Sequence, residues 1–437
     1  MAVPSAFSTA ALTPKAYSGV RIEKNLAYGP RQNLPNEGAA YPALFGANDE
    51  FGLPVNRHET AQTYDVYYPA KCGPETPVLL YVHGGAWCMP FDKNAAAEFF
   101  MGIAASGWAV YSMNYVMPSM EVVTKPGTPL RKGSTFADML RDIDLMVAEV
   151  GRDAPRRGFR CGKIALGGES AGAHLSSLYA YDQDNPKPLS LGLSHPVRVG
   201  LLLNLIGPID LSDPQFAKVG SAAFRFMNPE KDFLAFFSGF MPECPATLEG
   251  FAKYSPINLI TSNSVPTIAS YSQMTGCDHD GIIPVGQFAA LTNRLAACGV
   301  PYIGRLHPNT MHAETMGPNC RDFARAWYLE TLANWKTQLQ VVKAEPVWPA
   351  GLEREMNSNH SFVCDLPAAA EDRTAVLRYT CASFAQVWLD GKLAAFGPAR
   401  GPHGWSRLDE VPLAESEHAR VREAVEDVDS RAVKLVD

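Results

Sequence analysis

Residues 163–175 of the chain read Lys-Ile-Ala-Leu-Gly-Gly-Glu-Ser-Ala-Gly-Ala-His-Leu. Residues 163–166, of which the last three are apolar, predict a short strand, and the residues from 171 to 181 predict a helix. Between them, Gly168-Glu-Ser-Ala-Gly172 matches the pattern G-x-S-x-G. Such a sharp strand-to-helix turn strains its serine and exposes the hydroxyl, and small neighbours let strand and helix approach closely. The stretch therefore predicts that Ser170 is a nucleophile.

The alternation of strand and helix patterns continues on both sides of this stretch. Strands are expected at 64–68, 77–82, 108–113, 163–166, 199–204, 266–271 and 302–306, and helices at 94–105, 135–150, 171–181, 285–297 and 321–338. Short continuous apolar runs suit strands that are covered on both faces of a parallel sheet. Strands that alternate with helices indicate an α/β fold with a mostly parallel central sheet.

The length of 437 residues suggests a large domain with a smaller appendage. We expect an arm packed on the main domain over residues 1–60, the α/β domain over 61–340, a linker over 341–352 and a β-rich module over 353–437. The alternation breaks between residues 210 and 254, where an aromatic-rich segment lies. This segment suits either a cap over the active site or an ordinary peripheral helical insertion.

Composition argues against several classes of function. The net charge of −7 disfavours nucleic-acid binding, which needs clustered Lys and Arg. No apolar run approaches the length that spans a bilayer, and the first 20 residues lack the basic region of a secretory signal. The nine cysteines are scattered without a CxxC pair, so neither a zinc site nor a disulfide framework is indicated. We therefore expect a cytoplasmic protein, or a secreted one if a signal has been removed.

A second glycine-containing motif, His83-Gly84-Gly85-Ala86-Trp87, ends the strand expected at 77–82. Acyl transfer develops negative charge on a carbonyl oxygen, and unobstructed backbone N–H groups stabilise that charge. Gly84 and Gly85 offer such donors, and the N–H of Ala171 joins them. These three residues are the expected oxyanion hole.

Three polar or aromatic residues beside these motifs have less specific expected roles. His83 is expected to anchor the loop and not to carry a proton. Trp87 suits a wall of the acyl pocket or, as an alternative, a position in the core. We assign Trp87 and Glu169, the neighbour of the serine, as candidate substrate-binding residues.

The general base and the acid that orients it should follow the serine in the order acid, then histidine. Asp280 follows an expected strand and precedes Pro284, so it is the candidate acid, with Asp278 as the alternative. His312 lies in the loop after the last expected strand and is the candidate base, with His307 as the alternative. The cluster Asp278-His279-Asp280 could also hold a metal, but no suitably spaced partner supports a metal site.

With these motifs together, the region from about 60 to 340 resembles the α/β-hydrolase superfamily. It is most similar to esterases with an HGG oxyanion loop: the hormone-sensitive-lipase-like and feruloyl/acetyl-esterase-like groups, and the arylformamidases. Ala86 stands where the hormone-sensitive-lipase-like enzymes have a third glycine, and the HGG-x-W pattern is similar to the other two groups. The resemblance implies a serine carboxylesterase that needs no cofactor or metal.

The implied mechanism is acyl transfer through an acyl-enzyme, with Ser170 as nucleophile, His312 as base and Asp280 as its orienting acid. The expected substrate is a small-molecule or carbohydrate ester. We expect no nucleic-acid or membrane partner, and the sequence does not indicate the oligomeric state. Two alternatives remain: an amidase similar to arylformamidases, and a noncatalytic carbohydrate-binding or scaffold protein. A complete triad argues against the second alternative.

The C-terminal part carries short strand patterns at 376–380, 385–389 and 393–396, with a hairpin signal at Asp390-Gly391. The stretch from about 359 to 410 resembles the accessory β-sandwich of bacterial α-L-rhamnosidases. Trp388 and Trp405 could stack on a sugar or pack the small core. The charged tail at 413–437 predicts a helix, which would leave the module incomplete. The association of an esterase domain with a glycosidase-like module suggests acetyl or feruloyl groups on plant-derived carbohydrate as substrates.

Overall fold

The computed structural model describes most of the α/β region and the C-terminal strands. The described residues are 18–31, 61–74, 76–88, 91–94, 96–118, 133–159, 162–225, 233–312, 359–365, 375–379, 384–389, 392–398, 409–413 and 420–426. Contacts divide the chain into two compact units, one of residues 1–302 and 307–333 and the other of residues 303–306 and 334–437. The linker and the helix expected at 321–338 lie outside the described residues.

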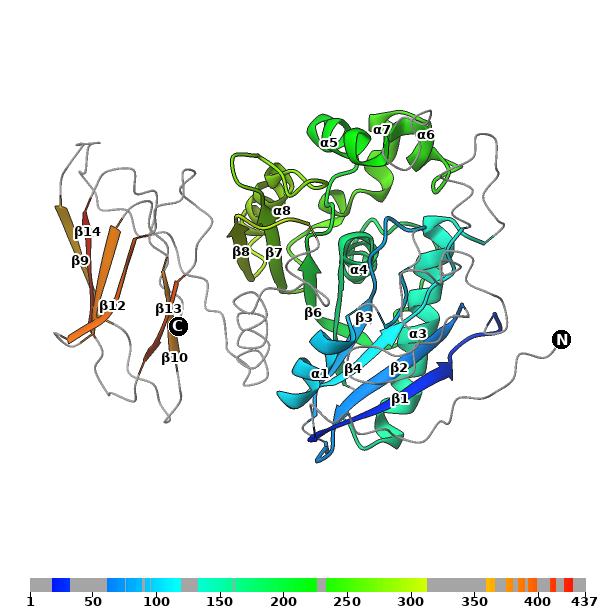
Figure 1. The fold of residues 1–437 in the computed structure, drawn as a ribbon, viewed down its shortest axis with the longest axis horizontal. Helices are drawn as coiled ribbons and strands as arrows, with labels where there is room; N and C mark the ends of the chain where they lie inside the picture. Colours follow the sequence, from blue (N-terminus) through cyan, green and yellow to red (C-terminus); the bar gives the residue numbers. More distant parts are fainter. Residues whose placement is uncertain are drawn as a thin grey trace. The chain divides into compact units, whose positions relative to one another are not determined.

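An eight-stranded sheet forms the centre of the first unit (Figure 1). Its strands are β1 (Val20–Ala27), β2 (Thr63–Pro69), β3 (Val78–Val82), β4 (Ala109–Met113), β5 (Lys163–Glu169), β6 (Arg198–Leu205), β7 (Thr267–Gln273) and β8 (Tyr302–Pro308). They lie in the order β1-β2-β4-β3-β5-β6-β7-β8. The pairs β1–β2 and β2–β4 are antiparallel, whereas β4–β3, β3–β5, β5–β6 and β6–β7 are parallel. This mixed, mostly parallel sheet is the α/β-hydrolase fold that the sequence predicts.

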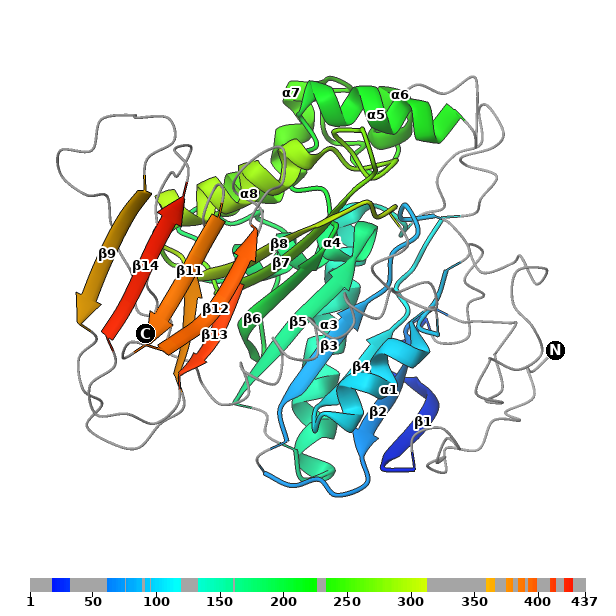
Figure 2. The ribbon, with the colours of Figure 1, turned by 60° about the vertical axis from the view of Figure 1, so that its left-hand side comes forward.

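The direction of the chain across this sheet reverses at β3. The connecting helices are α1 (Ala97–Ala105), α3 (Phe136–Arg156), α4 (Ser170–Asp182) and α8 (Val285–Ala297). Crossovers between parallel strands are right-handed. The step from β3 to β4 and the steps from β5 onward run in opposite directions, so α1 covers one face and α3 and α4 the other (Figure 2). Ligands bind such sheets beyond the carboxyl ends of the strands at the reversal. The loops after β3 and β5 are therefore the place to look for a site.

The N-terminal part contributes more than the extended arm that the sequence predicts. Residues 20–27 form the edge strand β1, which pairs antiparallel with β2. Its alternation is interrupted by a shift of register between Glu23 and Leu26, where Asn25 has a φ of 61°. This bulge hides the period-two pattern from a reading of the sequence, although Val20 and Ile22 are fully buried.

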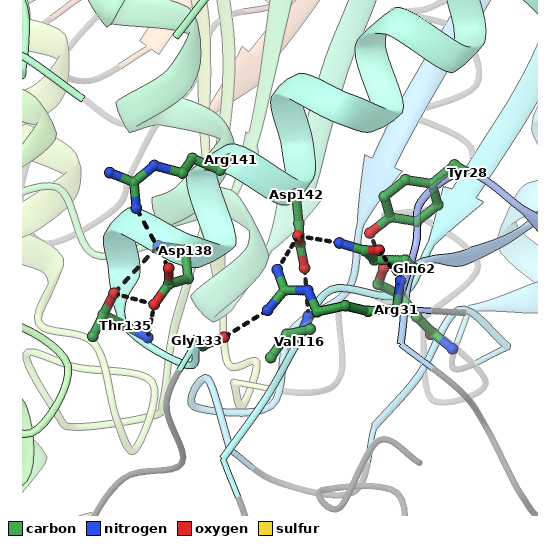
Figure 3. Close-up of polar contacts among 10 residues, drawn as sticks. Tyr28, Arg31, Gln62, Val116, Gly133, Thr135, Asp138, Arg141 and Asp142 are labelled. Carbon is green, nitrogen blue, oxygen red and sulfur yellow. Dashed lines mark hydrogen bonds and ion pairs between the residues drawn. The ribbon is translucent and has the colours of Figure 1, made fainter. Parts of the chain in front are cut away.

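A buried carboxylate ties this N-terminal part to the main domain (Figure 3). Asp142 on α3 accepts hydrogen bonds from Arg31 (2.6 Å), from the Gln62 side chain (2.8 Å) and from the Val116 N–H (2.9 Å). Arg31 also donates to the carbonyl of Gly133 at 3.1 Å. Burial raises the pKa of Asp142, and the Arg31 guanidinium opposes that rise. The carboxylate thus joins three separate stretches of the chain.

Replacing Asp142 with alanine is expected to lower the free energy of unfolding by about 3 kcal/mol, because Arg31 and Gln62 lose their partner inside the protein. Urea denaturation would measure the loss. Asp138→Ala is the matched control on the same helix. Asp138 completes the capping box of Thr135 and forms an exposed ion pair with Arg141 at 3.4 Å, so its loss should cost about 1 kcal/mol. Equal losses in the two variants would contradict the central role of Asp142.

The segment where the alternation breaks is a helical insertion between β6 and β7. Its described elements are α5 (Pro214–Arg225), α6 (Phe233–Ser238), α7 (Leu248–Phe251) and the 3-10 helix η2 (Ala252–Tyr254), followed by η3 (Pro256–Leu259). The ring of Phe237 lies 4.5 Å from that of Phe233 and 5.9 Å from that of Phe251. The insertion therefore has an aromatic core of its own, at the end of the sheet where β6 ends (Figure 1). None of the described helices combines the length and apolar character of a membrane span.

The C-terminal unit contains six described strands. They are β9 (Asn359–Asp365), β10 (Ala375–Tyr379), β11 (Phe384–Leu389), β12 (Lys392–Pro398), β13 (Asp409–Leu413) and β14 (Arg420–Glu426), in sheets ordered β12-β11-β14-β9 and β10-β13. β11 and β12 pair antiparallel across residues 390–391, which confirms the predicted hairpin. The helical prediction for the tail is wrong over β14, which pairs with β9 and β11. Pairing on both sides overrides the local preference of a charged segment.

Candidate active site

Ser170 is the first residue of α4 and directly follows β5. Its φ of 48° is left-handed, a strained conformation for any residue but glycine. A Cβ on Gly172 would lie 2.0 Å from the carbonyl oxygen of Val82, and one on Gly168 would lie 2.4 Å from the same oxygen. Only glycine fits at these two positions, because the strand, the turn and the helix meet in backbone contact. The G-x-S-x-G pattern thus has a direct steric cause.

Two further side chains join Ser170 in a continuous hydrogen-bonded chain. His312 Nε2 lies 2.9 Å from Ser170 Oγ, and His312 Nδ1 lies 2.7 Å from Asp280 Oδ2. The backbone N–H of His312 also donates to the carbonyl of Asp280 at 2.9 Å. Asp280 lies in the loop after β7 and His312 in the loop after β8, so three separate loops at one edge of the sheet build the site.

The orientation of Asp280 is fixed by its own loop. The carboxyl group is buried, and its Oδ1 accepts hydrogen bonds from the N–H groups of Ile282 (2.9 Å) and Ile283 (2.7 Å). These two bonds leave Oδ2 directed at His312. A carboxylate held in this way selects the imidazole tautomer with the proton on Nδ1, which leaves Nε2 free to accept the serine proton.

The alternative residues lie elsewhere. Asp278 is exposed, and its carboxylate accepts a hydrogen bond from Gln215 at 2.5 Å. His307 is 1% exposed and lies 2.9 Å from the Ser270 hydroxyl. Neither side chain is part of the hydrogen-bonded chain that contains Ser170. Among the described residues, no group of three or more His, Cys, Asp or Glu side chains could hold a metal ion.

The loop after β3 lies against the serine. A Cβ on Gly84 would be 3.3 Å from Ser170 Cβ. The next three residues, Gly85, Ala86 and Trp87, all have left-handed φ angles, of 104°, 46° and 61°. The turn is closed by a hydrogen bond from the Cys88 N–H to the carbonyl of Gly85 at 3.0 Å. A strained backbone of this kind marks a loop held in a specific conformation.

The oxyanion donors differ in part from the expectation. The N–H of Gly84 donates to Glu169 Oε1 at 3.1 Å, so this donor is already occupied. In the described part of the chain no hydrogen bond is found for the N–H groups of Gly85 and Ala86. Ala171 lies in the first turn of α4, where N–H groups have no partner within the helix. Sequence reasoning missed Ala86, although its place at the third position after His83 is a usable signal.

The structure places Trp87 in the core. Its side chain is 2% exposed, and its ring centroid lies between 5.2 and 6.1 Å from those of four other rings: Phe136, His174, Phe237 and Phe240. Phe237 belongs to α6, so this ring connects the loop after β3 with the helical insertion. A role as a wall of the acyl pocket stays a prediction.

His83 has the surroundings of an anchor. Its ring is buried, stacks on Tyr115 at 4.5 Å, and has Nδ1 2.8 Å from the carbonyl oxygen of Gly84. Burial lowers the pKa of His83 to about 4. The pKa of the buried His174 is lowered to about 4 for the same reason. Both imidazoles are therefore neutral in the folded protein at neutral pH.

These two histidines predict a loss of stability in acid. Between pH 6.5 and about 4 the unfolded chain binds protons that the folded protein excludes, so stability falls as the pH falls and the effect levels off below about 4. Each histidine contributes on the order of 3 kcal/mol to this loss. Urea denaturation of wild type and His174→Asn from pH 7.5 to 4.5 would measure it. A slope that is equally steep in the variant would contradict the assignment.

Comparisons with known proteins agree with this geometry. A family model described as BD-FAE matches residues 64–295, more than half of the chain. Two proteins of Mycobacterium tuberculosis are similar in sequence. The probable carboxylic ester hydrolase LipM is 23% identical over 54% of this chain and 49% of its own, and the esterase LipC is 25% identical over 57% and 55%. The chain thus spans about half the length of these curated relatives.

Among solved structures, an inhibited esterase B from Lactobacillus rhamnosis has the same fold. The two structures superpose with a TM-score of 0.52 at 20% sequence identity, over 75% of this chain and 89% of the other. At this identity the likeness establishes the fold alone.

Proposed function

This chain belongs to the BD-FAE family of α/β-hydrolase esterases, and on that premise we propose that it is a serine carboxylesterase. The observation that carries the proposal is the chain of hydrogen bonds from Ser170 through His312 to Asp280. The serine lies on a strained turn, beside a loop whose Gly85 and Ala86 N–H groups have no hydrogen bond within the described residues. A nucleophile, a base, an orienting acid and oxyanion donors are the parts that acyl transfer requires.

In the proposed reaction His312 removes the proton of Ser170 as the serine oxygen attacks the ester carbonyl. Asp280 stabilises the imidazolium that forms. The N–H groups of Gly85, Ala86 and Ala171 are the candidate donors to the negative oxygen of the tetrahedral intermediate. His312 then gives its proton to the leaving alcohol. In the second step His312 takes a proton from water as the water attacks the acyl-enzyme, and it returns that proton to Ser170 as the acid leaves.

We further propose short acyl or aryl esters as the substrate class, including acetyl or feruloyl groups on plant-derived carbohydrate. The support is the family membership and the HGG-x-W pattern at residues 83–87, which is similar to that of feruloyl/acetyl-esterase-like enzymes. The resemblance of the C-terminal module to a glycosidase accessory domain points to the same kind of substrate.

Hydrolysis of p-nitrophenyl acetate, butyrate and octanoate, beside an aryl ester and its matched N-formyl aryl amide, tests this proposal. We expect the acetate and butyrate to be cleaved, and the aryl ester to be cleaved faster than the amide. A formamide rate more than about tenfold above the ester rate would instead identify an amidase, because one pocket would then stabilise the amide transition state better. Inactivity on every substrate would favour a noncatalytic binding protein.

A further inference from the structure

The carboxyl group of Glu169 bridges the serine turn and the loop after β3. Glu169 immediately precedes Ser170, and its side chain is only 8% exposed. Its Oε1 accepts the hydrogen bond from the Gly84 N–H at 3.1 Å, and its Oε2 accepts one from the Tyr81 hydroxyl. Tyr81 belongs to β3, so both partners of the carboxyl group lie on the strand and loop opposite.

This bridge lies where the sheet pairing ends. The last paired residues of the two strands are Val82 on β3 and Gly168 on β5. Beyond them the loop leaves the sheet, and the N–H of Gly84, two residues after Val82, is bound by a side chain and not by the neighbouring strand. The Glu169 carboxyl group therefore continues the hydrogen bonding of the sheet by two residues, up to the edge of the active site.

The bridged loop needs such a restraint. Gly85, Ala86 and Trp87 are held in left-handed conformations that a free loop would leave. The ring of Trp87 holds one end in the aromatic core, and the Gly84 hydrogen bond holds the other. A Cβ on Gly84 would lie 2.8 Å from Glu169 Cγ and 3.1 Å from the Glu169 carbonyl oxygen, so glycine is what lets the loop lie this close to the serine turn.

We propose that Glu169 is a positioning residue that fixes the loop after β3 against Ser170 and so preorganises the Gly85 and Ala86 N–H groups for the oxyanion. The inference rests on the proposed serine-esterase function and adds a role to it. It also replaces direct substrate contact as the expected role of Glu169. This tether, the hydrogen bond from the Gly84 N–H to the Glu169 carboxyl group, needs an acceptor oxygen at the position of Oε1. A glutamine amide provides that oxygen, whereas alanine removes it.

The main test compares Glu169→Gln and Glu169→Ala with wild type on p-nitrophenyl acetate. Glu169→Ala is expected to lower kcat about 30- to 100-fold, because displaced oxyanion donors act on the transition state and not on bound substrate. The KM should stay within about threefold for the same reason. Glu169→Gln is expected to keep kcat within about threefold of wild type, since its amide oxygen still accepts from Gly84.

Asp182→Ala is the matched control. Asp182 is a buried carboxylate at the other end of α4, and it also accepts a backbone hydrogen bond, from Leu189, and a side-chain bond, from His195. Its removal should lower the melting temperature as Glu169→Ala does but leave kcat unchanged. If Glu169→Ala fails to fold, Tyr81→Phe removes the second hydrogen bond to the carboxyl group and keeps the ring, and it should lower kcat about three- to tenfold.

A fluorophosphonate probe separates the two proposals. The rate at which it labels Ser170, followed by mass spectrometry, reports the same oxyanion stabilisation without turnover. Labelling of wild type that slows in Glu169→Ala supports the tether. Equal labelling rates and equal kcat in wild type and Glu169→Ala would overturn the tether and leave the esterase function standing. A Glu169→Gln variant that is as impaired as Glu169→Ala would have the same meaning. Absence of both labelling and hydrolysis in wild type overturns the esterase function and the tether together.

Discussion

Replacing Ser170 with alanine is expected to lower kcat on p-nitrophenyl acetate by at least about a thousandfold. The serine oxygen lies at the end of the hydrogen-bonded chain, on the strained turn, and His312 Nε2 at 2.9 Å is placed to take its proton as it attacks a carbonyl. The variant keeps the oxyanion donors, so a small residual rate should remain. Steady-state hydrolysis by wild type and variant, at matched concentration, measures the effect.

Ser170→Gly is the companion variant because it separates chemistry from fold. The φ of 48° at this position suits glycine, whereas alanine is as strained there as serine. We expect both variants to be inactive and the glycine variant to be more stable than the alanine variant by about 1 kcal/mol. Full activity in either variant would show that the nucleophile is another residue.

Replacing Asp280 with asparagine is expected to lower kcat by about three to four orders of magnitude. The shape of the side chain stays the same, but an amide nitrogen at the position of Oδ2 would oppose the N–H of His312 at 2.7 Å. The imidazole would then favour the other tautomer and could not accept the serine proton. The loss should appear in kcat with little change in KM, as it does for a group that acts in the transition state.

Asp278→Asn is the matched control, since it makes the same chemical change two residues away. Asp278 is exposed and its partner is Gln215, so we expect kcat within about threefold of wild type. A larger loss for Asp278→Asn than for Asp280→Asn would contradict the geometry of the site. Circular dichroism of both variants would exclude a general loss of structure.

The local features of the site could be predicted because short stretches carry them. The serine turn depends on contacts between residues that are close in sequence and on glycines that no other residue could replace. Buried parallel strands appear in the sequence as short continuous apolar runs, and amphipathic helices as apolar residues spaced three or four apart. The pattern therefore indicates the order of strands and helices along the α/β region, and the structure contains every predicted element that lies in its described residues between 61 and 312.

Two strands, β1 and β14, were not predicted for a physical reason. β1 pairs on one side only and carries a bulge at Asn25, so its sequence does not alternate cleanly. β14 is rich in charge and takes its conformation from the two strands beside it. In both segments the backbone hydrogen bonds come from residues far away in the sequence. Local propensity is too weak to decide such cases.

The sequence by itself determined the fold class, the nucleophile candidate and the two loops in which the acid and base should lie. The sequence favoured Asp280 over Asp278 and His312 over His307, but only the tertiary structure shows which of them meet Ser170, because the members of each pair are close in sequence and have the same chemistry. The direction of each side chain depends on hydrogen bonds such as those from Ile283 and Ser270, which no local pattern records.

The tertiary structure also decided that the Gly84 N–H of the loop after β3 is occupied by a hydrogen bond. By sequence, Gly84 and Gly85 are equivalent donors. In the fold, the Gly84 N–H meets the Glu169 carboxyl across the gap between β3 and β5. The two partners are 85 residues apart, so they are neighbours only once the parallel pairing of those strands has formed. Motifs indicate which residues a site needs, and long-range packing decides which of their atoms remain available.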